Sequence, residues 1–183
     1  ITALGPETLV DLGMNPDGIL DFPIKNCEVK VPFSRKDMTV EVEGFDFAKA
    51  RNIARGGVIS CEWTAQMILA FEVMADYCRG KDITKARSYL DKAFFYANEL
   101  EKMIISSPSP VGKADPTLPY ASEANVDTGH GWRTPKGNRV GSLSATAYFL
   151  IAYKGINPLE ASHLGVSLET RHGRSNFSYT KTD

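Results

Sequence analysis

The side chains best suited to chemistry gather in one segment, residues 118–142. This segment combines carboxylates, an imidazole, a guanidinium group and two flat aromatic rings, at Tyr120, Glu123, Asp127, His130, Trp132 and Arg133. Gly129 and Gly131 flank the histidine, and a glycine allows the backbone to turn tightly beside a ligand because it lacks a Cβ atom. We therefore expect a binding surface in this segment.

A further carboxylate, Glu62, lies in the segment 61–66, at the start of an apolar periodic run. A carboxylate in the first turn of a helix is stabilised by the helix dipole, which explains Glu62 without any catalytic role. The alternative is that Glu62 projects into a cleft opposite residues 118–142. The sequence leaves both interpretations open.

Paired carboxylates beside aromatic rings are typical of carbohydrate chemistry. One carboxylic acid protonates the leaving oxygen while the second attacks the sugar or activates water, and the apolar sugar face stacks on Trp or Tyr. We predict Glu62 and Asp127 as the catalytic pair, with Glu123 in reserve. The predicted substrate-binding residues are Trp63, Tyr120, Glu123, His130, Trp132 and Arg133.

Each loop residue also has a structural interpretation. Asp127 could cap the turn at residues 128–129, and Glu123 could be a solvated surface group. His130 could fasten the loop by donating a hydrogen bond. Arg133 could bind a substrate carboxylate bidentately or form an ion pair with Asp127. The sequence does not decide between these roles.

No metal ion or other cofactor is predicted. Glu123, Asp127 and His130 could supply up to three metal ligands, but His163 and His172 show no recognisable ligand spacing. The chain also lacks a phosphate-binding loop, a nucleophile elbow and a dinucleotide-binding fingerprint. The three cysteines share no CxxC spacing, so neither a disulfide framework nor a zinc site is indicated.

Composition and charge exclude several classes of function. The 183 residues carry a formal net charge of −1, so the chain lacks the basic excess of a protein that neutralises nucleic-acid phosphates. No run of about 18 apolar residues exists, and no transmembrane segment is predicted. Cys61 and Cys78 lie in an apolar stretch and are interpreted as buried small hydrophobes.

The two ends of the sequence carry separate expectations. The chain starts at Ile1 without a visible signal peptide, which indicates a processed product or part of a longer polypeptide. Its cellular location stays open, with an extracytoplasmic one favoured if the protein acts on carbohydrate. Residues 160–183 are polar and aperiodic, which predicts a surface tail or an arm onto a neighbour.

Before the polar tail, the chain divides into an N-terminal segment, residues 1–43, and a helical domain, residues 44–159, which includes the functional loop. Residues 1–25 are rich in glycine and proline, and only a short helical turn at residues 7–12 is expected there. Valines alternate with charged residues between residues 27 and 43, which predicts a β-hairpin. A short helix is expected over residues 44–55, through Phe45, Phe47, Ala50 and Ile53.

Three longer helices are predicted within residues 44–159. Apolar residues at spacings of three and four predict a helix over 58–78 that starts at Gly56–Gly57, and a second over 84–105, capped by Asp82 or Thr84. The third helix, over 142–153, is apolar on nearly every side and is expected to be buried on several faces.

Chain direction predicts where the site lies. The first two helices are joined by about five residues, so they should pack antiparallel, and the second should end at the pole where the first begins. The connection to the third helix, residues 106–141, is longer than a typical loop and starts at that pole, which favours a functional loop. Glu62 and this loop should therefore meet.

Antiparallel helix pairs with long loops at one end resemble the (α/α) toroid, or six-hairpin glycosidase-like, superfamily. Residues 60–66 (Ser-Cys-Glu-Trp-Thr-Ala-Gln) and 127–135 (Asp-Thr-Gly-His-Gly-Trp-Arg-Thr-Pro) resemble its cleft segments, and residues 141–147 and 155–159 resemble an inner helix and its terminator. The resemblance implies a mainly α fold of helical hairpins of the (α/α)-toroid type, here with a small N-terminal β-hairpin. It also implies carbohydrate as the ligand and acidic catalysts, carried onto Glu62 and Asp127.

A complete toroid needs about twelve helices, which is roughly twice this chain. A partial one would expose apolar helix edges, so we predict association with another chain or with the remainder of a longer polypeptide. The predicted function is glycoside hydrolase-like cleavage of an oligo- or polysaccharide. The alternatives are a non-catalytic carbohydrate-binding subunit, with Trp63, Trp132 and Tyr120 as a stacking floor, and a structural assembly protein.

Overall fold

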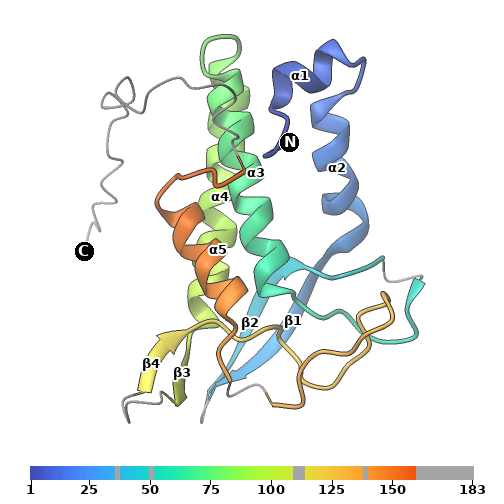
Figure 1. The fold of residues 1–183 in the computed structure, drawn as a ribbon, viewed down its shortest axis with the longest axis vertical. Coiled ribbons are helices and arrows are strands. Elements are labelled where there is room, and N and C mark those ends of the chain that lie inside the picture. Colours follow the sequence, from blue (N-terminus) through green and yellow to red (C-terminus); the bar gives the residue numbers. More distant parts are fainter. Residues whose placement is uncertain (36–37, 50–51, 109–113, 138–139, 160–183) are drawn as a thin grey trace.

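The computed structural model describes residues 1–35, 38–49, 52–108, 114–137 and 140–159. These residues form five helices and two antiparallel β-hairpins (Figure 1). The helices are α1 (Pro6–Asp11), α2 (Pro16–Cys27), α3 (Cys61–Cys78), α4 (Ile83–Lys102) and α5 (Leu143–Tyr153), and the strands are β1 (Glu28–Arg35), β2 (Met38–Phe45), β3 (Ile105–Pro108) and β4 (Ala114–Thr117). The secondary structure is therefore mixed α and β.

Helices α3 and α4 form the antiparallel pair predicted from the sequence (Figure 1). Ser60 caps α3 with its side chain, so the helix begins after this residue and not at Gly56–Gly57. Asp82 caps α4 in the same way, as predicted. Aromatic rings fill the space between the two helices, with the Phe71 and Tyr96 centroids 5.8 Å apart.

The predicted β-hairpin is confirmed as β1 and β2. The strands pair in antiparallel register, from Glu28 opposite Phe45 to Arg35 opposite Met38. The hairpin packs against α4 and α3, where the ring centroids of Phe45 and Tyr96 lie 4.8 Å apart. Alternate residues of β1, Val31 and Phe33, are buried in the common core, as a period-two strand requires. In β2 the alternation gives Val42 and Gly44, and the end of the strand, Phe45, is buried as well.

The region before the hairpin is helical, in contrast to the irregular segment that its glycines and prolines predict. Helix α1 confirms the short helical turn, but α2 continues through Pro23, which should break a helix. Asn15 caps the start of α2. Asp17 then binds α4, accepting hydrogen bonds from Lys85 Nζ at 2.6 Å and from the Tyr89 hydroxyl. Such tertiary contacts outweigh local propensity, and the local sequence does not reveal them.

The short helix predicted over residues 44–55 is not found over residues 44–49, whereas Asn52 has the 3₁₀-helical conformation and its amide donates to Lys49 O at 2.8 Å. Strand β2 extends to Phe45, and Ala50, one of the predicted apolar positions, lies outside the described residues. Gly44 allows a close approach to α3, because an added Cβ would lie 2.9 Å from Thr64 Oγ1. The strand end is therefore pressed against the start of α3, and Thr64 Oγ1 accepts a hydrogen bond from the Phe45 amide at 3.0 Å.

The long connection between α4 and α5 contains a second hairpin, β3–β4, which is not predicted from the sequence. Its strands have four residues each, too few for an alternating pattern to be recognised. They also include Pro108 and Pro116, which weaken the signal for a strand. The predicted loop over residues 106–141 is thus partly regular.

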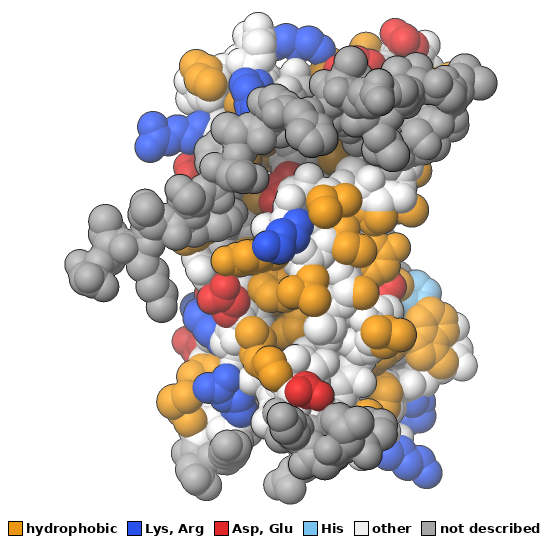
Figure 2. All heavy atoms as spheres, turned by 60° about the vertical axis from the view of Figure 1, so that its left-hand side comes forward, with side chains coloured by type: hydrophobic (Ala, Val, Ile, Leu, Met, Phe, Trp, Pro, Cys, Tyr) orange, Lys and Arg blue, Asp and Glu red, His pale blue; other side chains and the backbone are white. Residues whose placement is uncertain are grey.

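Helix α5 confirms the third predicted helix but not its burial on several faces. It packs on α3, and its buried residues are Ala145, Phe149 and Ala152. Its other side is open to solvent, with Leu143 87% and Leu150 54% exposed. Figure 2 turns this side of the molecule forward and shows hydrophobic side chains gathered over its middle.

The described residues contain one antiparallel pair of long helices, α3 and α4, and the ring of hairpins implied by the toroid resemblance is not seen among them. No helix within the described ranges is long and apolar enough to cross a membrane. The predicted polar tail, residues 160–183, lies outside the described residues together with His163 and His172.

Candidate functional site

Three segments that are distant in sequence meet at the start of α3. The Ser122 amide donates a hydrogen bond to the Ile59 carbonyl oxygen, and the Ile59 amide donates one to the Ser122 hydroxyl oxygen, both at 2.9 Å. Ser60 N donates to Phe45 O at 2.8 Å. The end of β2, the start of α3 and residues 118–142 therefore share one pole of the molecule, which confirms the meeting predicted from chain direction (Figure 1).

Five rings from these segments form the aromatic cluster: Phe47, Trp63, Tyr120, His130 and Trp132. The centroid of Phe47 lies 5.3 Å from that of Trp63 and 5.7 Å from that of Tyr120. The His130 ring lies 5.4 Å from Trp63 and 5.3 Å from Trp132. Trp132 Nε1 donates to the Tyr120 hydroxyl at 3.2 Å, which closes the circle of contacts. Four predicted substrate-binding residues are thus brought together.

Exposure increases across the cluster. Phe47 is only 3% exposed and forms its base, whereas Trp132 is 45% exposed at its outer edge. His130 Nε2 lies 2.5 Å from the Phe47 carbonyl oxygen, and because a carbonyl only accepts, this nitrogen donates. His130 therefore fastens the loop to the cluster base, which is one of the roles predicted for it.

A tight turn presents the outer part of the cluster. Thr128 is fully buried and donates to the Trp132 carbonyl oxygen from its amide at 3.1 Å and from its hydroxyl at 2.7 Å. Asp127 Oδ1 accepts from Gly129 N at 2.9 Å, so this carboxylate caps the turn, as its structural interpretation proposed. Gly129 and Gly131 have φ angles of 81° and 86°, in the region that favours glycine.

Arg55 fastens this turn to the body of the protein. Its guanidinium group forms hydrogen bonds of 2.7 and 2.8 Å with the two carboxylate oxygens of Asp46, and it also donates to the main-chain carbonyl of Asp127. Asp46 is 2% exposed and accepts a third hydrogen bond, from Val58 N at 2.9 Å. This bidentate buried pair fixes the position of the turn.

A cavity of about 540 Å³ opens beside the cluster, between α2, residues 45–49 and α3. Its walls are mainly apolar, and Phe22 and Met67 line it together with Trp63 and His130. Trp63 and His130 thus belong both to the aromatic cluster and to the cavity. Trp132 does not line the cavity and faces the outer surface instead.

Neither of the predicted catalytic carboxylates, Glu62 and Asp127, lines the cavity. Glu62 accepts a hydrogen bond from Gln66 Nε2 at 3.1 Å. Gln66 lines the cavity, and residues four apart are neighbours on a helix, so Glu62 lies at the cavity edge. Asp127 is exposed on the turn. The pairing of Glu62 with Asp127 in catalysis stays a prediction.

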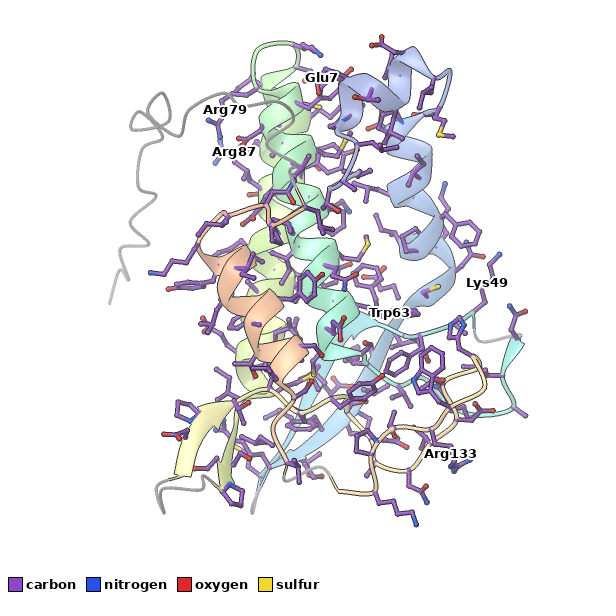
Figure 3. All side chains as sticks on the ribbon, in the orientation of Figure 1. Glu7, Lys49, Trp63, Arg79, Arg87 and Arg133 are labelled. Atoms are coloured by element: carbon purple, nitrogen blue, oxygen red, sulfur yellow. The ribbon has the colours of Figure 1, made fainter. Side chains whose placement is uncertain are left out.

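Glu123 and Arg133 lie at the exposed rim of the loop (Figure 3, in which Arg133 is labelled). The main-chain carbonyl of Glu123 accepts from Thr134 Oγ1 at 2.9 Å, which fixes the backbone beneath its carboxylate. Arg133 Nε donates to Asn125 Oδ1 at 3.2 Å, and another of its nitrogens donates to the Asn125 carbonyl. Asn125, and not Asp127, is therefore the partner of Arg133 among the described residues.

The base of the cluster is not identified from the sequence. The sequence predicts Phe47 in a helix, but Phe47 lies in a bend, and the sequence predicts no role for Asp46 and Arg55. An acidic and a basic residue nine positions apart form no recognisable motif, so they carry little signal. Only the three-dimensional junction shows that these residues support the loop.

Within the described residues, no group of three or more His, Cys, Asp or Glu side chains is placed to hold a metal ion. Cys61 and Cys78 are buried as predicted, and burial raises the pKa of the Cys61 thiol.

No protein-family model, curated protein or solved structure matches this chain. The geometry of the site is thus the main support for a function.

Proposed function

We propose that this protein binds an oligo- or polysaccharide through the aromatic cluster. The observation that carries the proposal is the Trp132 ring, which is 45% exposed yet held in place by His130 and Tyr120. A fixed indole ring offers a flat apolar surface and loses little conformational entropy on binding. The apolar face of a sugar ring fits such a surface.

The loop that carries this ring also carries hydrogen-bonding side chains. Glu123, Asn125, Asp127 and Arg133 are all exposed on the same loop. Carboxylates accept hydrogen bonds, guanidinium groups donate them and amides do both, so the rim can satisfy sugar hydroxyls of either sense. This mixture favours a carbohydrate over a purely apolar ligand on the outer surface of the cluster.

Cleavage of a glycosidic bond by Glu62 and Asp127 is the catalytic form of this proposal. Glu62 directly precedes Trp63 in the sequence, and Asp127 belongs to the turn that presents Trp132. Neither carboxylate forms an ion pair among the described residues, so no salt bridge has to break before either contacts a sugar.

The toroid resemblance extends the proposal to the whole molecule. In this view α3, α4 and α5 are part of a ring of (α/α)-toroid hairpins that further helices complete. The exposed apolar side of α5 supports it, because a helix that is apolar on both sides normally packs between two neighbours.

Binding is tested by titrating the protein with a panel of neutral and acidic oligosaccharides in a calorimeter. We expect saturable binding to at least one of them, and Trp132→Ala should weaken it by about tenfold or more because the stacking surface is lost. Tyr153→Ala is the matched control, since this aromatic residue on α5 is similarly exposed, at 44%, but lies outside the cluster. Equal loss in both variants would contradict the proposal.

Catalysis is tested with Asp127→Asn. The asparagine retains the Oδ1 acceptor that caps the turn, so fold and sugar binding should persist while turnover of the bound glycan falls by about 100-fold or more. Asp115→Asn, on β4, controls for the loss of an exposed carboxylate. Unchanged product formation in Asp127→Asn would remove Asp127 from the mechanism and leave binding as the function.

A further inference from the structure

The cavity beside the aromatic cluster has walls that do not suit a sugar. Side chains from α2, including Leu20 and Phe22, face Met67 and Ala70 from α3, with the ring of Trp63 at one end. Its volume of about 540 Å³ is in the range of ligand pockets, which are typically apolar with a few placed polar groups. Walls of this kind favour a ligand whose body is apolar, because only a minority of the lining side chains, among them Lys49 and Gln66, could pair with the many hydroxyl groups of a sugar.

The charge at the cavity rim is positive. Lys49 is half-buried there, with Nζ 4.2 Å from the centre of the Phe22 ring, and it forms no ion pair within the described residues. The carboxylate of Asp46 also reaches the rim, where it is paired with Arg55. Figure 3 shows Lys49 and Trp63 at similar heights along the molecule. The Lys49 ammonium group, which contacts the Phe22 ring but no carboxylate of the described residues, can therefore pair with an anion.

We infer that this cavity binds an apolar molecule that carries one anionic group, of the class of medium-chain carboxylates. The hydrocarbon would lie against Phe22, Trp63 and Met67, and the carboxylate would pair with the Lys49 ammonium group. This site is separate from the outer face of Trp132, so it goes beyond the proposed carbohydrate function and does not depend on it. Trp63 and His130 line this cavity, and the His130 ring also stacks on Trp132.

The first test compares three probes of equal chain length: decanoate, decan-1-ol and decylammonium. The chain has two tryptophans, so Trp132→Phe leaves Trp63, in the cavity wall, as the only indole reporter. We expect saturable changes in Trp63 emission, with decanoate binding at least about tenfold more tightly than decan-1-ol and decylammonium weakest. Equal affinity for decanoate and decan-1-ol, or no binding of decanoate, would overturn the inference.

Lys49→Met provides the decisive variant, because it keeps the apolar stem and removes the charge. It should abolish the preference for decanoate over decan-1-ol. Lys81→Met is the matched control: Lys81 Nζ lies 3.4 Å from the centre of the Tyr77 ring, a similar contact between a cation and an aromatic ring outside the cavity. A preference that survives in Lys49→Met, or is lost equally in Lys81→Met, would contradict the assigned carboxylate position.

A second measurement places the ligand without changing the cavity. Cys27 is half-buried in the cavity wall, whereas Cys61 and Cys78 are buried, so alkylation of the folded protein reports on Cys27. Burial, and then the charge of Asp46, raises the pKa of the Cys27 thiol, so the reaction is best followed above pH 8. Saturating decanoate should slow alkylation of Cys27 at least about fivefold, because the thiol reacts mainly in the molecules whose cavity is empty. An unchanged rate would place the ligand elsewhere and overturn the inference.

Discussion

A single carboxylate in the middle of α3 should control how the stability of the protein depends on pH. Burial, followed by the charge of Asp76, raises the pKa of Glu72 to about 7. Glu72 Oε2 is buried and has no hydrogen-bond partner within the described residues. A neutral, protonated side chain is the form that this environment tolerates.

The direction of the effect follows from proton linkage. The folded protein retains a proton on Glu72 that the unfolded chain releases near the ordinary pKa of 4.5, so the contribution of this group is largest below pH 4.5. It falls as the pH rises to about 7 and stays constant above that. Glu72→Gln should remove this decline and raise the free energy of unfolding at pH 8 by about 2 kcal/mol.

Urea unfolding of the wild type and Glu72→Gln at several pH values between 4 and 8 measures this difference. Glu101→Gln, an exposed position on α4, serves as the control and should leave the pH dependence unchanged. The same slope in the wild type and in Glu72→Gln would mean that Glu72 is ionised in the folded protein.

At the scale of residues, the sequence indicates which side chains matter but not their partners. Trp63, Tyr120, His130 and Trp132 are all predicted as site residues, and they touch one another. Phe47 is missed, because its place in the cluster depends on how β2 meets the start of α3. Contacts between distant segments have no local signature in one sequence.

At the scale of elements, the turn that carries His130 can be tested with its two glycines. Gly129 and Gly131 both have positive φ angles, so alanine is strained by about 1–2 kcal/mol at either position. Only Gly129 also packs tightly, since an added Cβ would lie 2.6 Å from Ile53 Cγ2 and 3.1 Å from Ala48 Cβ. An added Cβ at Gly131 would meet no atom within 4 Å among the described residues.

Gly129→Ala should therefore lower the free energy of unfolding by at least about 1 kcal/mol more than Gly131→Ala, because it adds a steric clash to the same backbone strain. It should also detach the turn from Ala48 and Ile53, which faster hydrogen exchange at the Thr128 amide would show. Equal destabilisation by the two variants would mean that the turn does not pack on these residues.

The elements also show where the spacing of apolar residues predicts secondary structure and where it does not. Helices α3 and α4 are recognised because their amphipathic runs are long. Asp82 is also recognised as the cap of α4, whereas the cap of α3, Ser60, is not predicted. Helix α2 is missed because Pro23 reads as a breaker while its packing against α4 is invisible in the local sequence. The strands of β3–β4 are too short for any pattern.

At the scale of the whole molecule, the open side of α5 predicts association. Leu143 and Leu150 are exposed on a helix that packs on α3 with its other side. Burying a leucine contributes about 1.5–3 kcal/mol, so Leu150→Lys should weaken self-association by about tenfold or more. Ile83→Lys is the control, because Ile83 is 69% exposed at the start of α4, away from this face.

Sedimentation velocity over a range of protein concentrations gives the association constant of each variant. A wild-type chain that stays monomeric at every concentration would contradict the prediction for this face.

Chain direction was sufficient to predict that the loop and the start of α3 share a pole. The number of helical hairpins was not predictable, because the resemblance rests on general architecture and the described residues contain one such pair.

The outer face of the Trp132 ring is the centre of the proposed function, and its own fluorescence tests it most directly. In Trp63→Phe, Trp132 is the only tryptophan, and its 45% exposure predicts a red-shifted emission that acrylamide quenches. With a saturating oligosaccharide we expect the emission to shift to the blue and quenching to fall by about half or more, because the sugar covers the indole. Calorimetric binding of the same oligosaccharide with no change in Trp132 emission or quenching would contradict the account.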